Sequence, residues 1–437
     1  MIDQIAFIAV TLVAAGVFMY SASLIYANIK MLKKAYPVNE IGKRLKMLLE
    51  IGFGQTKIMR YPIIGYAHAL VFWGFLLIAF GSAEMILDGL FGTERILKFL
   101  GIGYDFIMAG GDISAYVIGL LIIVFLFRRM FMHIKRFGGE EMNHKNHVDA
   151  NFALSLILLL MISLATMNIG YLKSGETIHG YYPISSAIAN MFTASTSTMT
   201  HMYHASLWIH VLLIYFFANY LPYSKHFHVF MSLPSVYFSR LTPLTQMTNM
   251  ESVTKEVKIM MDPNLAFAAP AEGEEEEEIA RFGMKDVEDG TWKNYLDSLT
   301  CTQCGRCTAA CPANQTGKKL SPRKVVKNYR ERMTEKAAGL RKDKSYDDSK
   351  SLLGDYITAE ELWACTTCNA CAQECPVNID HPSIILEMRR YIFMEESAAP
   401  SLLNSMSTNI ENNGAPWQYP PTDRLKWAED ISITINE

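Results

Sequence analysis

The sequence predicts a mainly α-helical protein with two unlike halves, one embedded in a membrane and one in the cytoplasm. Half of the 437 residues are hydrophobic and only 19% are charged, whereas soluble domains carry about a quarter charged residues. Apolar residues are concentrated in roughly the first half of the chain, and most charged residues follow them. A formal net charge of -3 gives no electrostatic reason to expect nucleic acid binding. All eight cysteines lie between Cys301 and Cys375, which indicates a local ligand set rather than a disulfide framework.

Five stretches are long and apolar enough to cross about 30 Å of hydrocarbon as helices. They cover residues 5–29, 62–87, 105–127, 150–172 and 203–221. The first has no basic leading region and no small-residue cleavage site before Lys30, which favours a retained anchor over a cleaved signal peptide.

Basic residues indicate how these helices are oriented, because Lys and Arg are retained on the cytoplasmic side. Eight of them lie between residues 30 and 60 and five between 128 and 145, whereas the other two loops hold only Arg95, Lys98 and Lys173. We therefore expect the amino terminus outside and everything after the fifth stretch, including the cysteines, in the reducing cytoplasm.

Histidines are placed where a haem could be bound. His68 lies near the cytoplasmic end of the second stretch, and the fifth is predicted to continue as one helix from His210 past Pro222 to His228. Eighteen residues make five helical turns, so His210 and His228 should share one face about 27 Å apart. His68 and His228 lie at the same inner level, as a b-type haem held between two helices requires. The alternative is interfacial or hydrogen-bonded histidines, but ionisable groups inside membranes are usually functional.

Two cysteine motifs with the same spacing follow the membrane half. Each reads C-x2-C-x2-C-x3-C-P, and they comprise Cys301, Cys304, Cys307 and Cys311, then Cys365, Cys368, Cys371 and Cys375. In bacterial ferredoxins, three thiolates of each such run bind one [4Fe-4S] cluster and the fourth crosses to the other cluster. The first cluster would use Cys301, Cys304, Cys307 and Cys375, and the second Cys365, Cys368, Cys371 and Cys311. Zinc is the alternative, but its sites seldom need four cysteines packed so closely.

The segments around these motifs are less specific. Residues 263–280 combine proline, alanine and an acidic run, a composition typical of a solvated linker, with a docking site as the alternative. The basic stretch 321–342 could dock an acidic partner, lie on anionic lipid or be a plain solvated helix. No dinucleotide fingerprint, P-loop or Ser-His-Asp arrangement is visible, which leaves single-electron carriers and a quinone as the organic substrate.

The sequence LPYSKHFHVFMSLPSVYFSR resembles the last helix of the di-haem gamma subunit of respiratory nitrate reductases. The five-helix plan with its amino terminus outside is similar too. This resemblance implies a cytochrome b bundle with haem ligands at His68, His210 and His228. Ten residues beyond His68, where that family has the outer ligand of its second helix, this chain has Ile78. Either the outer haem is absent, or His210 pairs with a residue off the second helix.

Over nearly the whole chain, the order of parts is similar to membrane oxidoreductases that connect electron-transfer flavoprotein to menaquinone. Heterodisulfide-reductase-like and sulfite-reduction-associated membrane complexes share the same parts. The segments FGMKDVEDGTWKNYLDSLTCTQCGRCTAACPAN and EELWACTTCNACAQECPV carry this resemblance. It implies an oxidoreductase component of the bacterial cytoplasmic membrane that works within a complex. A cysteine-rich domain with paired CCG motifs usually follows in such relatives, so we expect a separate cysteine-rich subunit to link this chain to the flavoprotein.

The predicted organisation has four parts: a five-helix membrane cytochrome b domain at 1–240, a linker at 241–282, a twin [4Fe-4S] ferredoxin-type domain at 283–396 and a polar tail at 397–437. We expect electrons to pass between a cytoplasmic donor and menaquinone through two clusters and haem b, with a second haem left open. The alternative is an electron-transfer subunit of a heterodisulfide- or sulfite-reductase-like complex. Glu84, Asp88 and Asp112, acidic residues in or near the outer half, are candidates for a quinone site because quinone chemistry needs a proton path.

Overall fold

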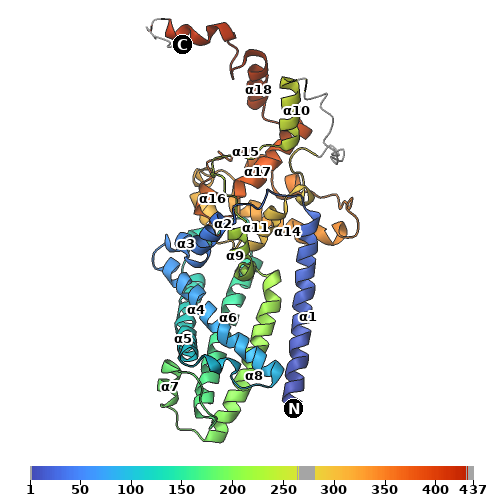
Figure 1. Ribbon diagram of the computed structural model, residues 1–437. Coiled ribbons are helices and arrows are strands. Elements are labelled where there is room, and N and C mark those ends of the chain that lie inside the picture. Colours follow the sequence, from blue (N-terminus) through green and yellow to red (C-terminus); the bar gives the residue numbers. More distant parts are fainter. Residues whose placement is uncertain (1, 263, 265–280, 430, 432–437) are drawn as a thin grey trace.

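The computed structural model describes residues 2–262, 264, 281–429 and 431. These residues are helical or irregular, with isolated β-bridges between Lys33 and Thr291 and between Leu353 and Ile357. Long helices form a bundle, and shorter helices form a second unit packed on one end of it (Figure 1). The predicted mainly α-helical fold is confirmed.

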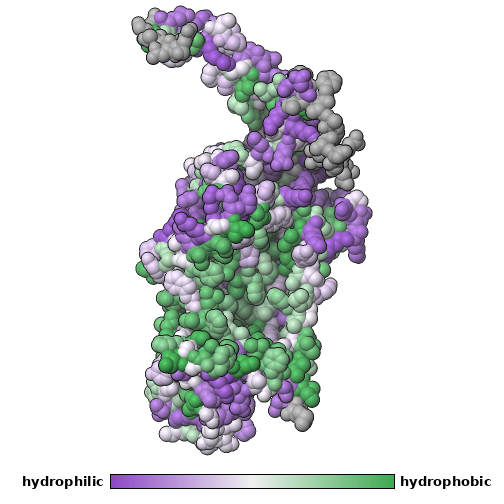
Figure 2. Space-filling model, in the orientation of Figure 1, coloured by the Kyte–Doolittle hydropathy of each residue, from purple (hydrophilic) through white to green (hydrophobic). Residues whose placement is uncertain are grey.

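Five helices in the described part of the chain are long and apolar enough to cross a membrane. They are α1 (Ile2–Met31), α4 (Ile64–Phe91), α5 (Ile102–Phe131), α6 (His144–Lys173) and α8 (Thr196–Tyr220). In Figure 2, hydrophobic side chains cover the bundle between two hydrophilic ends. The helices extend beyond the predicted apolar stretches because polar first turns are capped: Asn143 accepts a hydrogen bond from the Asn146 amide, and Ser195 accepts one from the Thr198 amide.

The prediction that the fifth helix continues through Pro222 is wrong. After Tyr220 the chain forms two 3-10 turns, Leu221–Tyr223 and Lys225–Phe227, and a new helix, α9 (His228–Tyr237), begins at His228. The proline ring removes one backbone donor. Asp149 of α6 then accepts a hydrogen bond from the Lys225 amide at 3.2 Å, which fixes the turn. His210 and His228 therefore do not lie on one continuous helical face.

Short helices connect and complete the bundle. They are α2 (Ile41–Met47), the π-helix Leu48–Phe53, α3 (Thr56–Met59), the 3-10 helices Ile96–Leu100 and Lys135–Phe137, and α7 (Pro183–Ala189). The second unit contains α11 (Trp292–Thr300), α12 (Arg306–Ala310), α13 (Pro312–Gln315), α14 (Pro322–Leu340), α15 (Ala359–Trp363), α16 (Ala370–Glu374) and α17 (His381–Arg390), with shorter turns at Val287–Asp289, Leu352–Tyr356 and Tyr391–Glu395.

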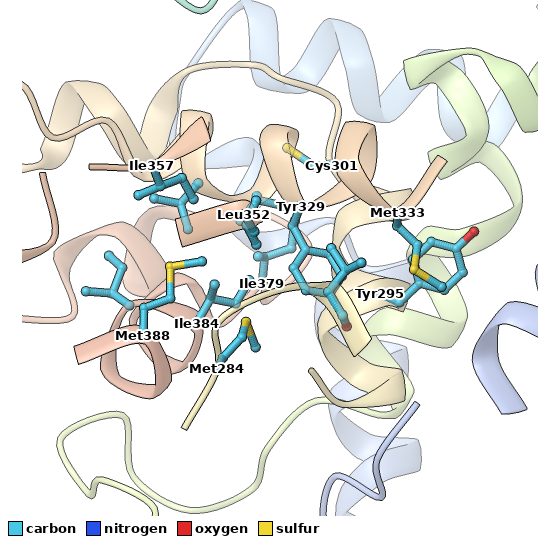
Figure 3. Packing of buried hydrophobic residues seen from close by; sticks show 14 of the residues in the cluster. Met284, Tyr295, Cys301, Tyr329, Met333, Leu352, Ile357, Ile379, Ile384 and Met388 are labelled. Carbon is cyan, nitrogen blue, oxygen red and sulfur yellow. The ribbon is translucent and has the colours of Figure 1, made fainter. Parts of the chain in front are cut away.

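The second unit and the bundle share one hydrophobic core. Figure 3 shows Tyr295 of α11, Tyr329 and Met333 of α14, and Ile384 and Met388 of α17 packed together. The same cluster includes Leu221 and Phe227, and partly buried residues of α1 and α8 pack against it. The two units are therefore docked through buried apolar surface, which fixes the cysteine motifs relative to the membrane helices.

Two further helices lie in segments predicted to be linker and tail. They are α10 (Glu251–Met261) and α18 (Ser401–Asn413), with a 3-10 helix at Pro421–Ala428, and Figure 1 shows them on the side away from the bundle. The acidic run of the predicted linker lies outside the described residues.

The basic stretch 321–342 is neither a solvated helix nor a docking surface. It forms α14, whose Arg323, Arg332 and Lys336 are buried. Arg323 pairs with Glu141 at 2.6 Å and donates to the carbonyls of Arg136 and Gly138, so it ties the second unit to the loop after α5. Spacing of charges along a helix could not reveal that their acidic partners come from distant segments.

Replacing Arg332 with methionine should strongly destabilise the second unit. Its guanidinium is fully buried and donates to both oxygens of Asp286 and to Asp348. Removing one partner of a buried pair leaves an uncompensated charge and costs about 3–5 kcal/mol. Thermal unfolding of the purified protein should show the loss, whereas Lys342→Met, at an exposed position of the same segment, should change little. Equal stability of both variants would contradict this account.

Candidate iron-sulfur and haem sites

The two cysteine motifs follow the same backbone path. In the first, Gln303 and Gly305 have positive φ angles of 56° and 76°, and in the second Thr367 and Asn369 have 53° and 58°. These are equivalent positions of the two motifs. Gly and Asn tolerate this left-handed region best, so Gly305 and Asn369 suit the position that precedes α12 and α16. The turn brings the Thr367 amide within 3.4 Å of the Cys365 sulfur, to which it donates a hydrogen bond.

Cys375, the last cysteine of the second motif, lies among the first three cysteines of the first motif. Burial raises the pKa of Cys307 well above its usual value, and the nearby thiols of Cys304, Cys301 and Cys375, followed by the weaker influence of Cys371, raise it further. Burial also raises the pKa of Cys375 to about 12, with contributions from Cys304 and Cys301. The thiols of Cys301, Cys304, Cys307 and Cys375 are called the first cysteine set. Bare thiolates are disfavoured in such a place, and iron would supply the compensating positive charge.

Cys311 crosses in the opposite direction. It lines a pocket together with Cys365, Cys368 and Cys371, and these four thiols are called the second cysteine set. Cys368 is exposed and Cys365 is half-buried, whereas Cys311 and Cys371 are buried. Across the described residues, no three His, Cys, Asp or Glu groups converge closely enough to hold a single metal ion. The thiols of the second set instead surround a shared space, an arrangement that suits a multi-iron cluster.

His68 of α4 and His228 at the start of α9 are brought together. His228 lies close enough to His68 for their charges to interact. Both histidines are half-buried. The Nδ1 atom of each is itself buried and has no hydrogen-bond partner. A buried polar atom without a partner is costly. Two half-buried imidazoles that meet from separate elements are nevertheless a donor set that fits a haem, which His68 and His228 would hold.

His226 also belongs to this site, although the sequence prediction assigns it no role. Its ring centroid lies 5.9 Å from that of His228. Its Nδ1 is 3.2 Å from the hydroxyl of Ser224, which orients the ring. The segment KHFH contains both His226 and His228, and helical periodicity alone does not show which of the two faces His68.

His210 is in a different environment from His68 and His228. It is 1% exposed, and its Nδ1 is 2.8 Å from the hydroxyl of Ser163 on α6. Its Nε2 is buried without a partner. Ile78 of α4 lies in a closed apolar cluster with residues such as Ile118 and Leu160. Within the described residues, nothing places a second imidazole opposite His210.

The three acidic quinone-site candidates all have structural partners. Glu84 is fully buried and accepts hydrogen bonds from Tyr104 at 2.8 Å and from the Leu97 amide at 3.0 Å. Asp88 accepts from the amides of Arg95 and Ile96. Asp112 accepts from the amides of Ile184 and Ser185, and so caps α7. Their carboxylates hold outer loops in place.

Several cations near the cysteines were not singled out from the sequence. Arg389 lies over the Trp363 ring at 5.0 Å and donates to the carbonyl oxygens of Leu362 and Cys365. Lys57, far from the motifs in sequence, donates to the carbonyl oxygen of Cys375 at 3.3 Å. Lone basic residues carry no local pattern, so only the fold reveals these contacts.

Residues 277–379 match the family model of the 4Fe-4S dicluster domain. This match covers both cysteine motifs.

Three relatives place the rest of the chain in context. The iron-sulfur-binding oxidoreductase FadF of Bacillus subtilis is 29% identical, over 98% of this chain and 61% of its own length. The EtfAB:quinone oxidoreductase of Syntrophomonas wolfei is 25% identical, over 90% of this chain and 55% of its own length. A component of the ferredoxin- and F(420)H(2)-dependent CoB-CoM heterodisulfide reductase of Methanosarcina acetivorans is 33% identical over 24% of this chain and 52% of its own length.

The chain thus spans somewhat more than half the length of the first two relatives. The resemblance to electron-transfer-flavoprotein oxidoreductases and heterodisulfide-reductase-like proteins is confirmed, and the relatives that match over most of the chain are named oxidoreductases. No solved structure matches the chain at a significant level.

Proposed function

We propose that this chain is a membrane-bound electron-transfer component that connects a cytoplasmic donor with menaquinone. The observation that carries the proposal is the docking of the iron-sulfur unit on the end of the bundle where His68 and His228 meet, with the first cysteine set on the side that contacts the membrane half. When bound, two [4Fe-4S] clusters and one haem b supply carriers for single electrons. The chain binds them through the eight cysteines and the two histidines, and its apolar core excludes water between them.

The donor is the part of the proposal that rests on relatives. One relative is named an EtfAB:quinone oxidoreductase, which supports electron-transfer flavoprotein as the soluble partner. In this proposal a separate cysteine-rich iron-sulfur protein connects the flavoprotein to the chain. The relatives with heterodisulfide reductase names support a second candidate, an electron-transfer component of a heterodisulfide- or sulfite-reductase-like complex. The two candidates share every residue of the sites and differ only in the soluble partner.

We propose a multi-pass orientation in the bacterial cytoplasmic membrane. The loops rich in Lys and Arg lie at the end of the bundle that carries the cysteine unit, and the start of α1 lies at the other end (Figure 1). The positive-inside rule then puts the clusters in the cytoplasm.

A quinone site belongs beside the haem, where a hydrophobic acceptor can collect electrons one at a time. Glu84, Asp88 and Asp112 are candidates on the outer side, but each is committed to loop contacts. The proposed haem between His68 and His228 lies on the inner side of the bundle, which favours a quinone site on that side. We therefore expect the neutral triple variant Glu84→Gln, Asp88→Asn and Asp112→Asn, if it folds, to retain haem reduction by a menaquinol analogue.

The test of the function uses the purified chain in liposomes. It should contain about eight cluster irons with acid-labile sulfide, as two cubanes require, together with b-type haem. A menaquinol analogue should reduce that haem in a stopped-flow experiment. Stoichiometric zinc without sulfide, or haem that no quinol reduces, would contradict the proposal. A triple variant that folds and binds haem but has lost quinol reduction would move the quinone site to the outer side.

A further inference from the structure

The two cysteine sets have different neighbours. Every residue that lines the pocket of the second set comes from the iron-sulfur unit, between Cys311 and Ile385. At its rim, Thr366 and Cys368 are exposed, and Cys368 is the one exposed cysteine of the eight. The second set is therefore the end of the unit that a soluble protein can approach.

The first cysteine set lies against the membrane half. Lys57 donates to the carbonyl oxygen of Cys375, and Arg306 donates to the carbonyl oxygen of Lys57 at 3.2 Å. Gly305 approaches the loop after α5 so closely that a Cβ would lie 2.3 Å from the carbonyl oxygen of Arg136. Arg306 interacts electrostatically with both Cys304 and His68. The first set is thus the end of the unit that faces the haem site.

The two cysteine sets also differ in the number of positively charged side chains around them. Five cations lie close enough to act on thiols of the first set: Lys57, Lys225, Arg306, Arg323 and Arg330. For the second set, the corresponding cation is Arg389, next to Cys365. Within the described residues, positive charge is therefore concentrated around the first set.

The unequal distribution of cations should give the clusters of the two sets different reduction potentials. Reducing a cluster adds one negative charge, so nearby cations favour the reduced form and raise the reduction potential. All five cations are partly or fully buried, where solvent screens charge only weakly. Water at Cys368 also favours the reduced form of the cluster in the second set, and so reduces the difference in potential between the two clusters. It reaches mainly that one thiolate, however. The cations around the first set should therefore dominate.

We infer that the second cysteine set is the electron-input end, where a soluble protein carrying a one-electron redox centre docks, and that the first cysteine set is the higher-potential output end toward His68. This inference rests on the proposed function, because it assumes that both sets bind clusters. Each step moves one electron from the donor through the second set to the first, with no bond made or broken and no proton transferred.

The order can be tested by electron paramagnetic resonance on the intact protein in detergent. Each cluster signal is assigned with the single variants Cys304→Ser and Cys368→Ser. A water-soluble paramagnetic dysprosium complex should speed the spin relaxation of the reduced cluster in the second set much more than that of the reduced cluster in the first set. The opposite pattern would overturn the inference. Failure to find two cluster signals and a haem in the wild type would overturn the proposed function instead.

Redox titration of the same signals tests the charge argument. The cluster of the first set should have the higher reduction potential. Lys57→Gln should lower that potential and leave the second cluster unchanged, whereas Arg389→Gln should lower only the second. Lys46→Gln, at an exposed position of α2, is the matched control and should shift neither. A higher potential at the second set, or equal shifts of both clusters in Lys57→Gln, would contradict the inference.

Discussion

Replacing Cys375 with serine should damage the cluster held by the first cysteine motif, although Cys375 belongs to the second motif. The reason is spatial: Cys375 lies among Cys301, Cys304 and Cys307, whereas Cys311 lines the pocket of the second set. Serine is a poor substitute for a thiolate ligand of iron, so the affected cluster should be lost or converted. Electron transfer from a soluble donor to haem should then fall to background, because the output end of the unit is broken.

The measurement compares four variants by iron content and electron paramagnetic resonance. Cys375→Ser should resemble Cys304→Ser, and Cys311→Ser should resemble Cys368→Ser. If each motif held its own cluster with all four of its cysteines, Cys375→Ser would instead resemble Cys368→Ser. That outcome would refute crossed ligation. Menaquinol-driven haem reduction serves as an internal control, because it does not depend on the clusters and should persist in all four variants that fold.

The cysteine sets show what a repeated local motif predicts. The spacing alone gave the crossed groups of four, and the fold brings the same groups together because α12 and α16 pack against each other. Gly305 and Asn369 are residue types that favour the left-handed conformation, but the sequence analysis did not single them out. Backbone geometry within one motif fixes three cysteines of each set, whereas the fourth, Cys375 or Cys311, is brought in by the packing of α12 against α16.

Predictions that needed long-range information fared less well. The basic residues of α14 were expected to meet a partner, lipid or solvent, but Arg323 and Arg332 pair with Glu141, Asp286 and Asp348, which lie outside α14 in the same chain. The fifth helix was extended through Pro222 by counting turns, whereas Asp149 from another helix stabilises a break there. The burial of the α14 cations and the break after Tyr220 both depend on acidic residues of other segments, which the periodicity of a single helix does not reveal.

The break after Tyr220 bears directly on the haem. With a continuous helix, His210 and His228 would form a two-level ladder that implies two haems. The observed turn separates them, so the two histidines can serve different purposes. His228 meets His68 in a space with accessible surface, whereas His210 is enclosed and hydrogen-bonded to Ser163. The proposed haem is therefore the one between His68 and His228, at the end of the bundle next to the first cysteine set, and the His210 variant tests for a second haem.

Replacing either His68 or His228 with alanine should remove the b-type haem and with it all quinol-dependent reduction. These two imidazoles come from separate elements, α4 and α9, and neither has another partner for its buried Nδ1. With one imidazole removed, a single side chain would remain to hold a haem in an apolar site, so we expect the haem content to fall close to zero. Optical spectra of the purified variants and pyridine haemochrome content measure this directly.

Two controls separate haem ligation from folding. His210→Ala removes a buried imidazole of the bundle, yet should leave the haem content at one per chain, because its hydrogen bond to Ser163 is structural. His226→Ala tests which histidine of the KHFH segment is the ligand, since His226 lies beside His228 but is oriented by Ser224. Haem loss in His226→Ala with normal haem in His228→Ala would transfer the ligand role to His226. Loss of half of a two-haem content in His210→Ala would show that a second haem exists and that a partner other than Ile78 supports it.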